Sequence, residues 1–273
     1  MASSDIRSWY AAHHHDEWRR LRQDAYHQLE EMVTTHFLHK HLPRRGLILD
    51  AGSGPGRYSI ALAKAGYDVV LLDLVPDMLA LARRKARAAR VSQRFQGFIE
   101  GSIEDLSQFD AGSFDAVLCL GGPLNHLMGV RQRRRAAAEL ARVAKPRAHL
   151  FVSVISRLAM MRGMLLHFPH LLGHAKDHWE SGDYRPGENG EGFTAAHWFL
   201  PDELASLFAG VHAEVVELAG LEGLSAHHPR ETNQLKREHP RRWRLWQELI
   251  LATSTNPGVV GSSEHFLLVA QKR

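Results

Sequence analysis

The stretch "ILDAGSGPGRYSIALAKAGYDVVLLD", residues 48–73, constrains the fold more than any other part of the chain. An apolar run ends at Asp50 and is followed by a turn that contains three glycines. A segment of helical character comes next, and a second apolar run then ends at Asp73. A strand, a glycine turn, a helix and a second strand form a βαβ unit, in which the two strands lie parallel in one sheet. The chain is therefore predicted to be an α/β protein.

The same alternation of apolar runs and amphipathic segments continues beyond this unit. Strands are predicted at residues 47–50, 69–73, 95–100, 114–120, 149–155, 213–218 and 266–270. Helices are predicted at residues 56–65, 76–89, 131–143, 200–208 and 234–253, with one or two more within 17–42. Short, nearly all-apolar strands are typical of a sheet that is covered on both faces. We expect a Rossmann-like, seven-stranded, mostly parallel sheet with helices on both faces.

The pattern predicts one domain, residues 1–273, with three additions to the sheet. Residues 1–43 form an N-terminal helical cover, and residues 156–200 and 220–262 form two cap insertions. Within the first insertion, the Met- and Leu-rich segment 158–173 is interrupted by charged residues, histidines and a proline, which a membrane-spanning helix rarely tolerates. It is interpreted as a lid or a core helix, and no membrane partner is expected.

A single cysteine, Cys119, excludes an intrachain disulfide and argues against a cysteine-based metal site, so we expect no metal. The first residues lack the basic and apolar regions of a secretory signal, and we expect a cytoplasmic protein. The net charge is +4 and the pI is about 9.4, with arginines bunched near residues 83–87 and 131–135. These runs could contact phosphates, but they fit the solvated faces of amphipathic helices better. Nucleic acid is therefore an unfavoured partner that stays open.

The acid that ends the second strand suggests what the glycine turn binds. Asp73 follows Gly52 by 21 positions, where such an acid accepts hydrogen bonds from ribose hydroxyls. A dinucleotide site has its third glycine where this chain has Arg57, and here the third glycine is Gly56. A nicotinamide dinucleotide is therefore disfavoured.

Four motifs in order resemble those of the class I S-adenosylmethionine (SAM)-dependent methyltransferases. "DAGSGPG" resembles their motif I, "VVLLDLVPDMLALAR" their second motif, "FDAVLCLGGPLNHL" their strand-four motif, and "ELARVAKPRAHLFVSV" their following helix and fifth strand. The resemblance covers roughly residues 47–153. It implies the class I methyltransferase fold, with SAM as cofactor and S-adenosylhomocysteine as its product.

The resemblance also implies cofactor contacts, residue by residue. The methionine end is expected at Gly52, Ser53, Gly54 and Gly56, with Asp50 ordering the turn. Asp73 is expected to bind both ribose hydroxyls. The remaining expected cofactor contacts, most of them around adenine, are Leu74, Met78, Ser102, Ile103 and Leu120. Many relatives have an acid where this chain has Ser102, and Glu104 or Asp105 is an alternative.

Methyl transfer needs an acceptor in line with the methyl group and removal of the acceptor's proton. Asn125 and His126 follow the fourth strand, and His126 is a candidate general base that could equally cap or pack on the next helix. In the first insertion, Tyr184 and His197 are candidates to line a substrate chamber, although "FTAAHWF" is more often core. The N-terminal helix around Trp18, Arg20, Tyr26 and Glu30 resembles a cover that closes over SAM.

The sequence therefore favours an enzyme that methylates an oxygen, nitrogen or sulfur atom of a small molecule, as a monomer or homodimer. "LGGPLNH" differs from the motif of amino-methylating DNA enzymes, and no catalytic cysteine is available for C5-pyrimidine methylation. Two alternatives stay open. One is a methyltransferase of RNA or the ribosome, and the other is a non-catalytic SAM-binding protein.

Overall fold

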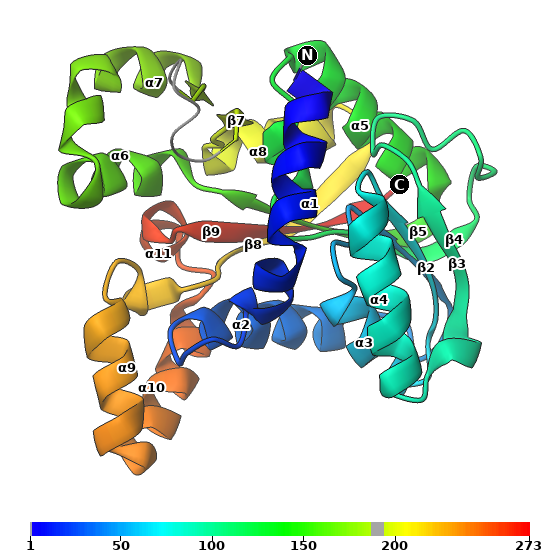
Figure 1. Ribbon diagram of the computed structural model, residues 1–273, viewed down its shortest axis with the longest axis horizontal. Coiled ribbons are helices and arrows are strands. Elements are labelled where there is room, and N and C mark those ends of the chain that lie inside the picture. The colour runs from blue at the N-terminus through cyan, green and yellow to red at the C-terminus, as the bar shows by residue number, and fades with distance from the viewer. Residues whose placement is uncertain (1, 187–193) are drawn as a thin grey trace.

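A twisted seven-stranded sheet forms the centre of the computed structural model, which describes residues 2–186 and 194–273 (Figure 1). Its strands are β1 (Leu47–Ala51), β2 (Asp68–Asp73), β3 (Phe95–Glu100), β4 (Phe114–Cys119), β5 (Ala144–Ile155), β8 (Ala213–Gly220) and β9 (His265–Lys272). They lie in the order β3-β2-β1-β4-β5-β9-β8. β9 runs antiparallel to both of its neighbours, β5 and β8, and the other neighbouring strands are parallel. The predicted fold is confirmed. The strand order reverses beside β1, and this is the point where open α/β sheets bind ligands.

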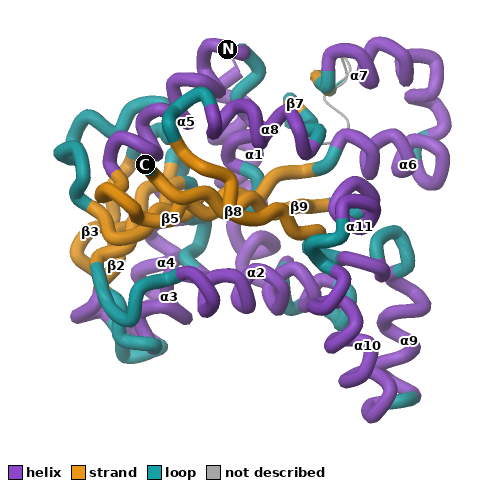
Figure 2. Tube along the Cα trace, turned by 180° about the vertical axis from the view of Figure 1, so that it is seen from behind, coloured by secondary structure: helices purple, strands orange, loops and turns teal. Residues whose placement is uncertain are grey.

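Helices cover both faces of the sheet because successive strand residues point to opposite sides. Leu49 packs in a core beneath α5 (Val130–Val143) and α8 (Pro201–Ala209), whereas its neighbour Ile48 packs against α2 (His27–His41), α3 (Arg57–Lys64) and α4 (Pro76–Ala88). Figure 2 shows these two helical layers on opposite sides of the strands. The short helices η1 (Ser92–Arg94) and η2 (Pro123–His126) join neighbouring elements. The long α1 (Ala2–Arg20) crosses in front of the sheet (Figure 1).

Two groups of elements project from the same side of the molecule in both views (Figures 1 and 2). The first comprises α6 (Arg157–His167), η3 (Pro169–His174), α7 (Ala175–Ser181), β6 (Asp183–Tyr184) and β7 (Ala196–His197). The second comprises η4 (Gly223–Ser225), α9 (Pro229–Glu238), α10 (Pro240–Thr253) and α11 (Pro257–Ser262). Residues 187–193 of the first insertion lie outside the described part. Among the helices that the structure describes, none has the length and apolar character needed to cross a membrane.

The prediction of one helix over residues 234–253 is wrong. Two helices occupy this region, and they meet at His239 and Pro240. Proline lacks an N–H group for the helical ladder and disfavours the helical conformation of the residue before it. His239 accordingly has φ −136° and ψ 68°, and α10 begins at Pro240.

Candidate functional site

A cavity of about 360 Å³ lies where β1, β2 and β4 end, and α1 forms part of its wall. This volume is within the range of about 300–1,000 Å³ that is usual for small-molecule sites. The predicted residues that line the cavity are Gly52, Ser53, Gly54, Asp73, Leu74, Met78, Ser102, Ile103, Leu120 and His126. Segments far apart in the sequence therefore meet at the point where the strand order reverses.

Asp73, the last residue of β2, is held in the cavity wall by backbone donors. Its Oδ2 accepts a hydrogen bond from the Gly54 N–H at 2.7 Å, and its Oδ1 accepts one from the Val75 N–H at 2.9 Å. Burial raises the pKa of Asp73 to about 6, although these backbone bonds favour the ionised form. Each carboxylate oxygen has a second lone pair, so Asp73 can accept further hydrogen bonds from a ligand.

The turn between β1 and α3 exposes backbone to the cavity. Gly54 has φ +52°, and a Cβ atom there would meet nothing within 4 Å. Gly52 has φ +79°, and a Cβ atom there would lie 2.4 Å from Cγ of Pro123. A side chain at Gly54 would fill ligand space, and one at Gly52 would collide with η2, so both positions favour glycine.

Asp50 and Gly56 belong to the predicted cofactor contacts but do not line the cavity. Asp50 is buried beneath the turn, where it accepts a hydrogen bond from the Ser59 hydroxyl at 2.6 Å, and burial raises its pKa to about 7. Gly56 caps α3 with φ +74°, and a Cβ atom there would lie 2.9 Å from Cδ2 of Leu71. The structure places Gly56 in the packing of α3 against β2, and not in the cavity wall.

His126 lies in the cavity wall, and its contacts indicate which of its two ring nitrogens carries the proton. Its Nδ1 lies 3.3 Å from the Ala195 carbonyl and 3.1 Å from the Thr194 hydroxyl, and its Nε2 lies 2.7 Å from the Tyr10 hydroxyl. A carbonyl can only accept, so Nδ1 carries the proton and Nε2 accepts from Tyr10. Burial lowers the pKa of His126, which favours this neutral form at pH 7.

The other three candidate catalytic residues do not line the cavity. Asn125 is fully buried, where it donates to the His197 carbonyl at 2.6 Å and accepts from the Ile155 N–H at 3.0 Å. The ring of His197 lies between carboxylate oxygens of Asp183 at 2.7 Å and Glu203 at 2.6 Å. These contacts fasten the first insertion to the end of β5.

Tyr184 likewise packs inside the first insertion. Its ring stacks on Trp198 with centroids 5.3 Å apart, in a small core that Met164 also joins. The core interpretation therefore describes His197 and Tyr184 better than the chamber interpretation does.

Several cavity residues come from α1, and sequence reasoning missed three of them, Ile6, Tyr10 and Glu17. Arg20, at the end of α1, also lines the cavity and pairs with buried Glu30 at 2.5 Å. Trp18 lies between the guanidinium of Arg57 and the ammonium of Lys85, at 4.2 and 4.6 Å from its ring. These contacts hold α1 over the cavity.

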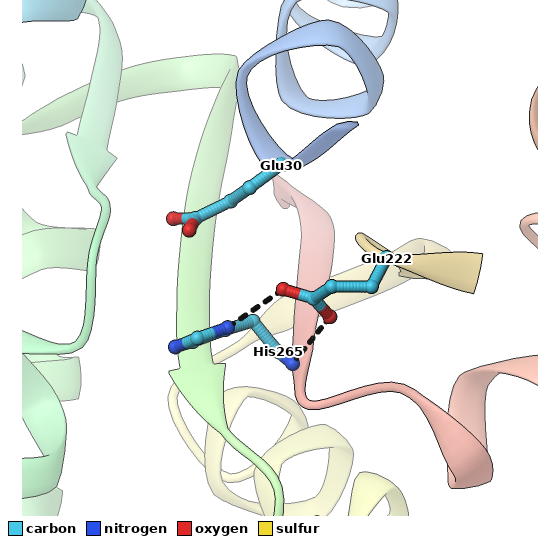
Figure 3. A group of neighbouring side chains, drawn as sticks. All are labelled: Glu30, Glu222 and His265. Atoms are coloured by element: carbon cyan, nitrogen blue, oxygen red, sulfur yellow. Dashed lines mark hydrogen bonds and ion pairs between the residues drawn. The ribbon is translucent and has the colours of Figure 1, made fainter. Parts of the chain in front are cut away.

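Glu30 also belongs to a buried charged cluster with Glu222 and His265 (Figure 3). Glu222 accepts from Nδ1 of His265 and from its backbone N–H, both at 2.8 Å. Burial alone would lower the pKa of His265, but the carboxylates of Glu222 and Glu30 raise it to about 9. With Arg20 beside Glu30, two cations match two carboxylates, so we interpret the cluster as an ion-pair network.

Residues 48–147 match the family model of a methyltransferase domain. A glycine/sarcosine N-methyltransferase of Parasynechococcus marenigrum is 38% identical over 135 residues, which are 48% of this chain and 45% of that protein. A ubiquinone biosynthesis O-methyltransferase of Xanthomonas axonopodis pv. citri is 36% identical over 117 residues, which are 42% of this chain and 45% of that protein. The chain thus spans less than half the length of these curated relatives.

Solved structures share the fold over much more of the chain. A SAM-dependent methyltransferase from Methanosarcina mazei aligns with a TM-score of 0.61 at 23% identity, over 86% of this chain and 96% of that one. A Burkholderia thailandensis 1,6-didemethyltoxoflavin-N1-methyltransferase aligns with a TM-score of 0.56 at 18% identity, over 98% of this chain and 88% of that one. At these identities the likeness establishes the fold.

Proposed function

We propose that the protein is a class I SAM-dependent methyltransferase that transfers a methyl group from SAM to a small molecule, because residues 48–147 match the family model of a methyltransferase domain. The acceptor atom is an oxygen, nitrogen or sulfur. One observation carries the proposal: Asp73 and the glycine turn line the same cavity at the point where the strand order reverses. The N- and O-methyltransferases among the relatives support it.

The residues of the cavity fit SAM. Asp73 would accept the ribose hydroxyls, and the open backbone at Gly54 leaves room for the methionine part. Met78 and Ile103 provide apolar surface for adenine, and Ser102 provides a hydroxyl for its amino group. When bound, SAM supplies a methyl group on a positively charged sulfur.

The chain's own part in the reaction is to remove the acceptor's proton. We assign this role to His126, whose Nε2 has its lone pair directed at the Tyr10 hydroxyl. An acceptor O–H or N–H that reaches Tyr10 would give its proton to the Tyr10 oxygen while the Tyr10 proton moves to His126. The neutral state of His126 leaves Nε2 able to receive that proton.

The remaining elements are proposed to form a cap around the acceptor. Residues 1–43 cover the cavity through α1. The insertions 156–200 and 220–262 project from one side of the sheet (Figure 1). The contact between Thr194 and His126 supports this role for the first insertion. We further propose a cytoplasmic location, which the single buried Cys119 supports.

The test is transfer of a labelled methyl group from SAM in the presence of a cell extract that contains both small molecules and RNA. We expect label in a low-mass product. Label in RNA would indicate the RNA alternative, and SAM binding without any label would indicate a non-catalytic SAM-binding protein.

The role of His126 is tested in the same assay. We expect His126→Gln to lower turnover by about 10²- to 10⁴-fold, the usual contribution of a general base, with SAM affinity unchanged. His36→Gln, on an exposed position of α2, is the matched control and should retain full turnover. Full turnover by His126→Gln would contradict the assignment.

A further inference from the structure

The ring of His126 contacts both the N-terminal cover and the first insertion. Its Nε2 lies 2.7 Å from the Tyr10 hydroxyl of α1. Its Nδ1 lies 3.1 Å from the Thr194 hydroxyl and 3.3 Å from the Ala195 carbonyl, both of which belong to the first insertion. Two segments that are far apart in the sequence therefore contact opposite nitrogens of one ring in the cavity wall.

The part of the insertion that contacts His126 is also fastened to η2 by the residue before it. Asn125 donates from Nδ2 to the His197 carbonyl at 2.6 Å and accepts at Oδ1 from the Ile155 N–H at 3.0 Å. The ring of His197 is itself held between two carboxylates. Neighbouring side chains of η2 thus hold the carbonyls of Ala195 and His197, so the insertion has a fixed position beside the His126 ring.

The partners of the two ring nitrogens favour one form of the neutral ring. A neutral imidazole carries its proton on one nitrogen and a lone pair on the other, and the hydrogen bonds that it makes decide which. The Ala195 carbonyl can only accept, and the Thr194 hydroxyl can accept as well, so both favour a proton on Nδ1. The lone pair then lies on Nε2 and faces Tyr10. The opposite form would place a lone pair against the Ala195 carbonyl.

We propose that Thr194 and Ala195 are positioning residues that hold the ring of His126 in the neutral form able to receive the acceptor's proton. The inference rests on the proposed function, because it takes His126 as the general base. Thr194 is buried and does not line the cavity, so it acts through His126. The first insertion thereby takes part in the reaction and does more than cover the acceptor.

The form of the ring can be read by NMR of the full chain with ¹⁵N-labelled histidines. A ring nitrogen that carries a proton and one that carries a lone pair have well-separated ¹⁵N shifts. The signals of His126 are those that disappear in His126→Gln. At about pH 8, where the ring is neutral, we expect a proton on Nδ1 and a lone pair on Nε2. A proton on Nε2 in the unaltered chain would overturn the proposal.

Variants at Thr194 test its part in this arrangement. Thr194→Val removes the hydroxyl and keeps the shape, so the ratio of the two ring forms should shift about fivefold toward the form with the proton on Nε2, as expected for loss of one hydrogen bond. Thr194→Ser keeps a hydroxyl and should restore the unaltered shifts. Thr232→Val removes a buried hydroxyl from the second insertion and is the matched control. Unchanged His126 shifts in Thr194→Val, or an equal change in Thr232→Val, would refute the positioning role.

The NMR measurement requires no methyl acceptor, so its failure can be distinguished from failure of the proposed function. A proton on Nε2 would refute the positioning role and leave methyl transfer from SAM as proposed. Full turnover by His126→Gln would remove the general base, and the inference about Thr194 and Ala195 would fall with it. SAM binding by Thr194→Val, measured by calorimetry, would show that this variant folds.

Discussion

Replacing His265 with glutamine is predicted to change how the stability of the protein depends on pH. In the ion-pair network of Figure 3, His265 donates to Glu222 and lies near Glu30, and its pKa is raised from 6.5 to about 9. The folded state therefore binds this proton more tightly than the unfolded chain does. The resulting stabilisation is fully present below about pH 6.5 and is lost as the pH rises through about 9.

The size of this effect follows from the difference between the two pKa values. One pKa unit corresponds to about 1.4 kcal/mol, so protonation of His265 contributes about 3 kcal/mol to the free energy of unfolding under acidic conditions. The side chain of His265 is 23% exposed, so solvent screens the interaction only in part. The contribution is large compared with a total stability of about 5–15 kcal/mol.

The assay is urea unfolding of the unaltered chain and of His265→Gln at about pH 6 and about pH 9.5, on either side of the transition. The difference in unfolding free energy between the two proteins should shrink by about 3 kcal/mol from the lower to the higher pH. His228→Gln, at a side chain that is 65% exposed, is the control and should show no such change. A difference for His265→Gln that stays constant with pH would refute the reasoning.

Three further predictions concern the glycine turn, Asn125 and Asp73. Gly56→Ala should lower the free energy of unfolding by about 1–3 kcal/mol in a denaturant titration, because φ is +74° and the new Cβ atom would lie 2.9 Å from Leu71. An unchanged stability would contradict this packing role. Asn125→Ala should cost about 2 kcal/mol or more in the same titration and leave SAM affinity unchanged, because it removes a buried partner of the Ile155 N–H. A selective loss of SAM binding would instead place Asn125 in the site. SAM affinity, measured by calorimetry, should weaken as the pH falls through about 6, where Asp73 becomes protonated and loses acceptor capacity. An affinity that is flat across this range would exclude Asp73 as the ribose acid.

The strands and the glycine turn could be predicted from the sequence because their signals are local. Alternating apolar runs indicate β1 and β2, and the positions of Gly52, Gly54 and Asp73 relative to them indicate the edge of the sheet at which they meet. Pro240 was also a readable signal that a helix over residues 234–253 must be broken. These features depend on neighbours in the sequence.

The part of the site formed by α1 could not be predicted in the same way. Apart from Ile6, none of the α1 residues whose burial is described is fully buried, so no buried apolar stripe indicates which side of α1 faces the cavity. The position of Tyr10 depends on tertiary contacts such as its bond to His126, which is 116 positions away. Asn125 and His126 are adjacent in the sequence, yet only His126 lines the cavity, because the turn η2 directs the two side chains differently.

The most direct test of the account is calorimetric titration of the protein with SAM. We predict one binding site, and we predict that Asp73→Asn weakens the affinity by about ten- to a hundredfold, the range expected for hydrogen bonds to a charged acceptor. Asp68→Asn, at the opposite end of β2, is the matched control and should bind as the unaltered chain does. Failure of the folded, unaltered chain to bind SAM, or equal affinity for Asp73→Asn, would contradict the assignment of this cavity to SAM.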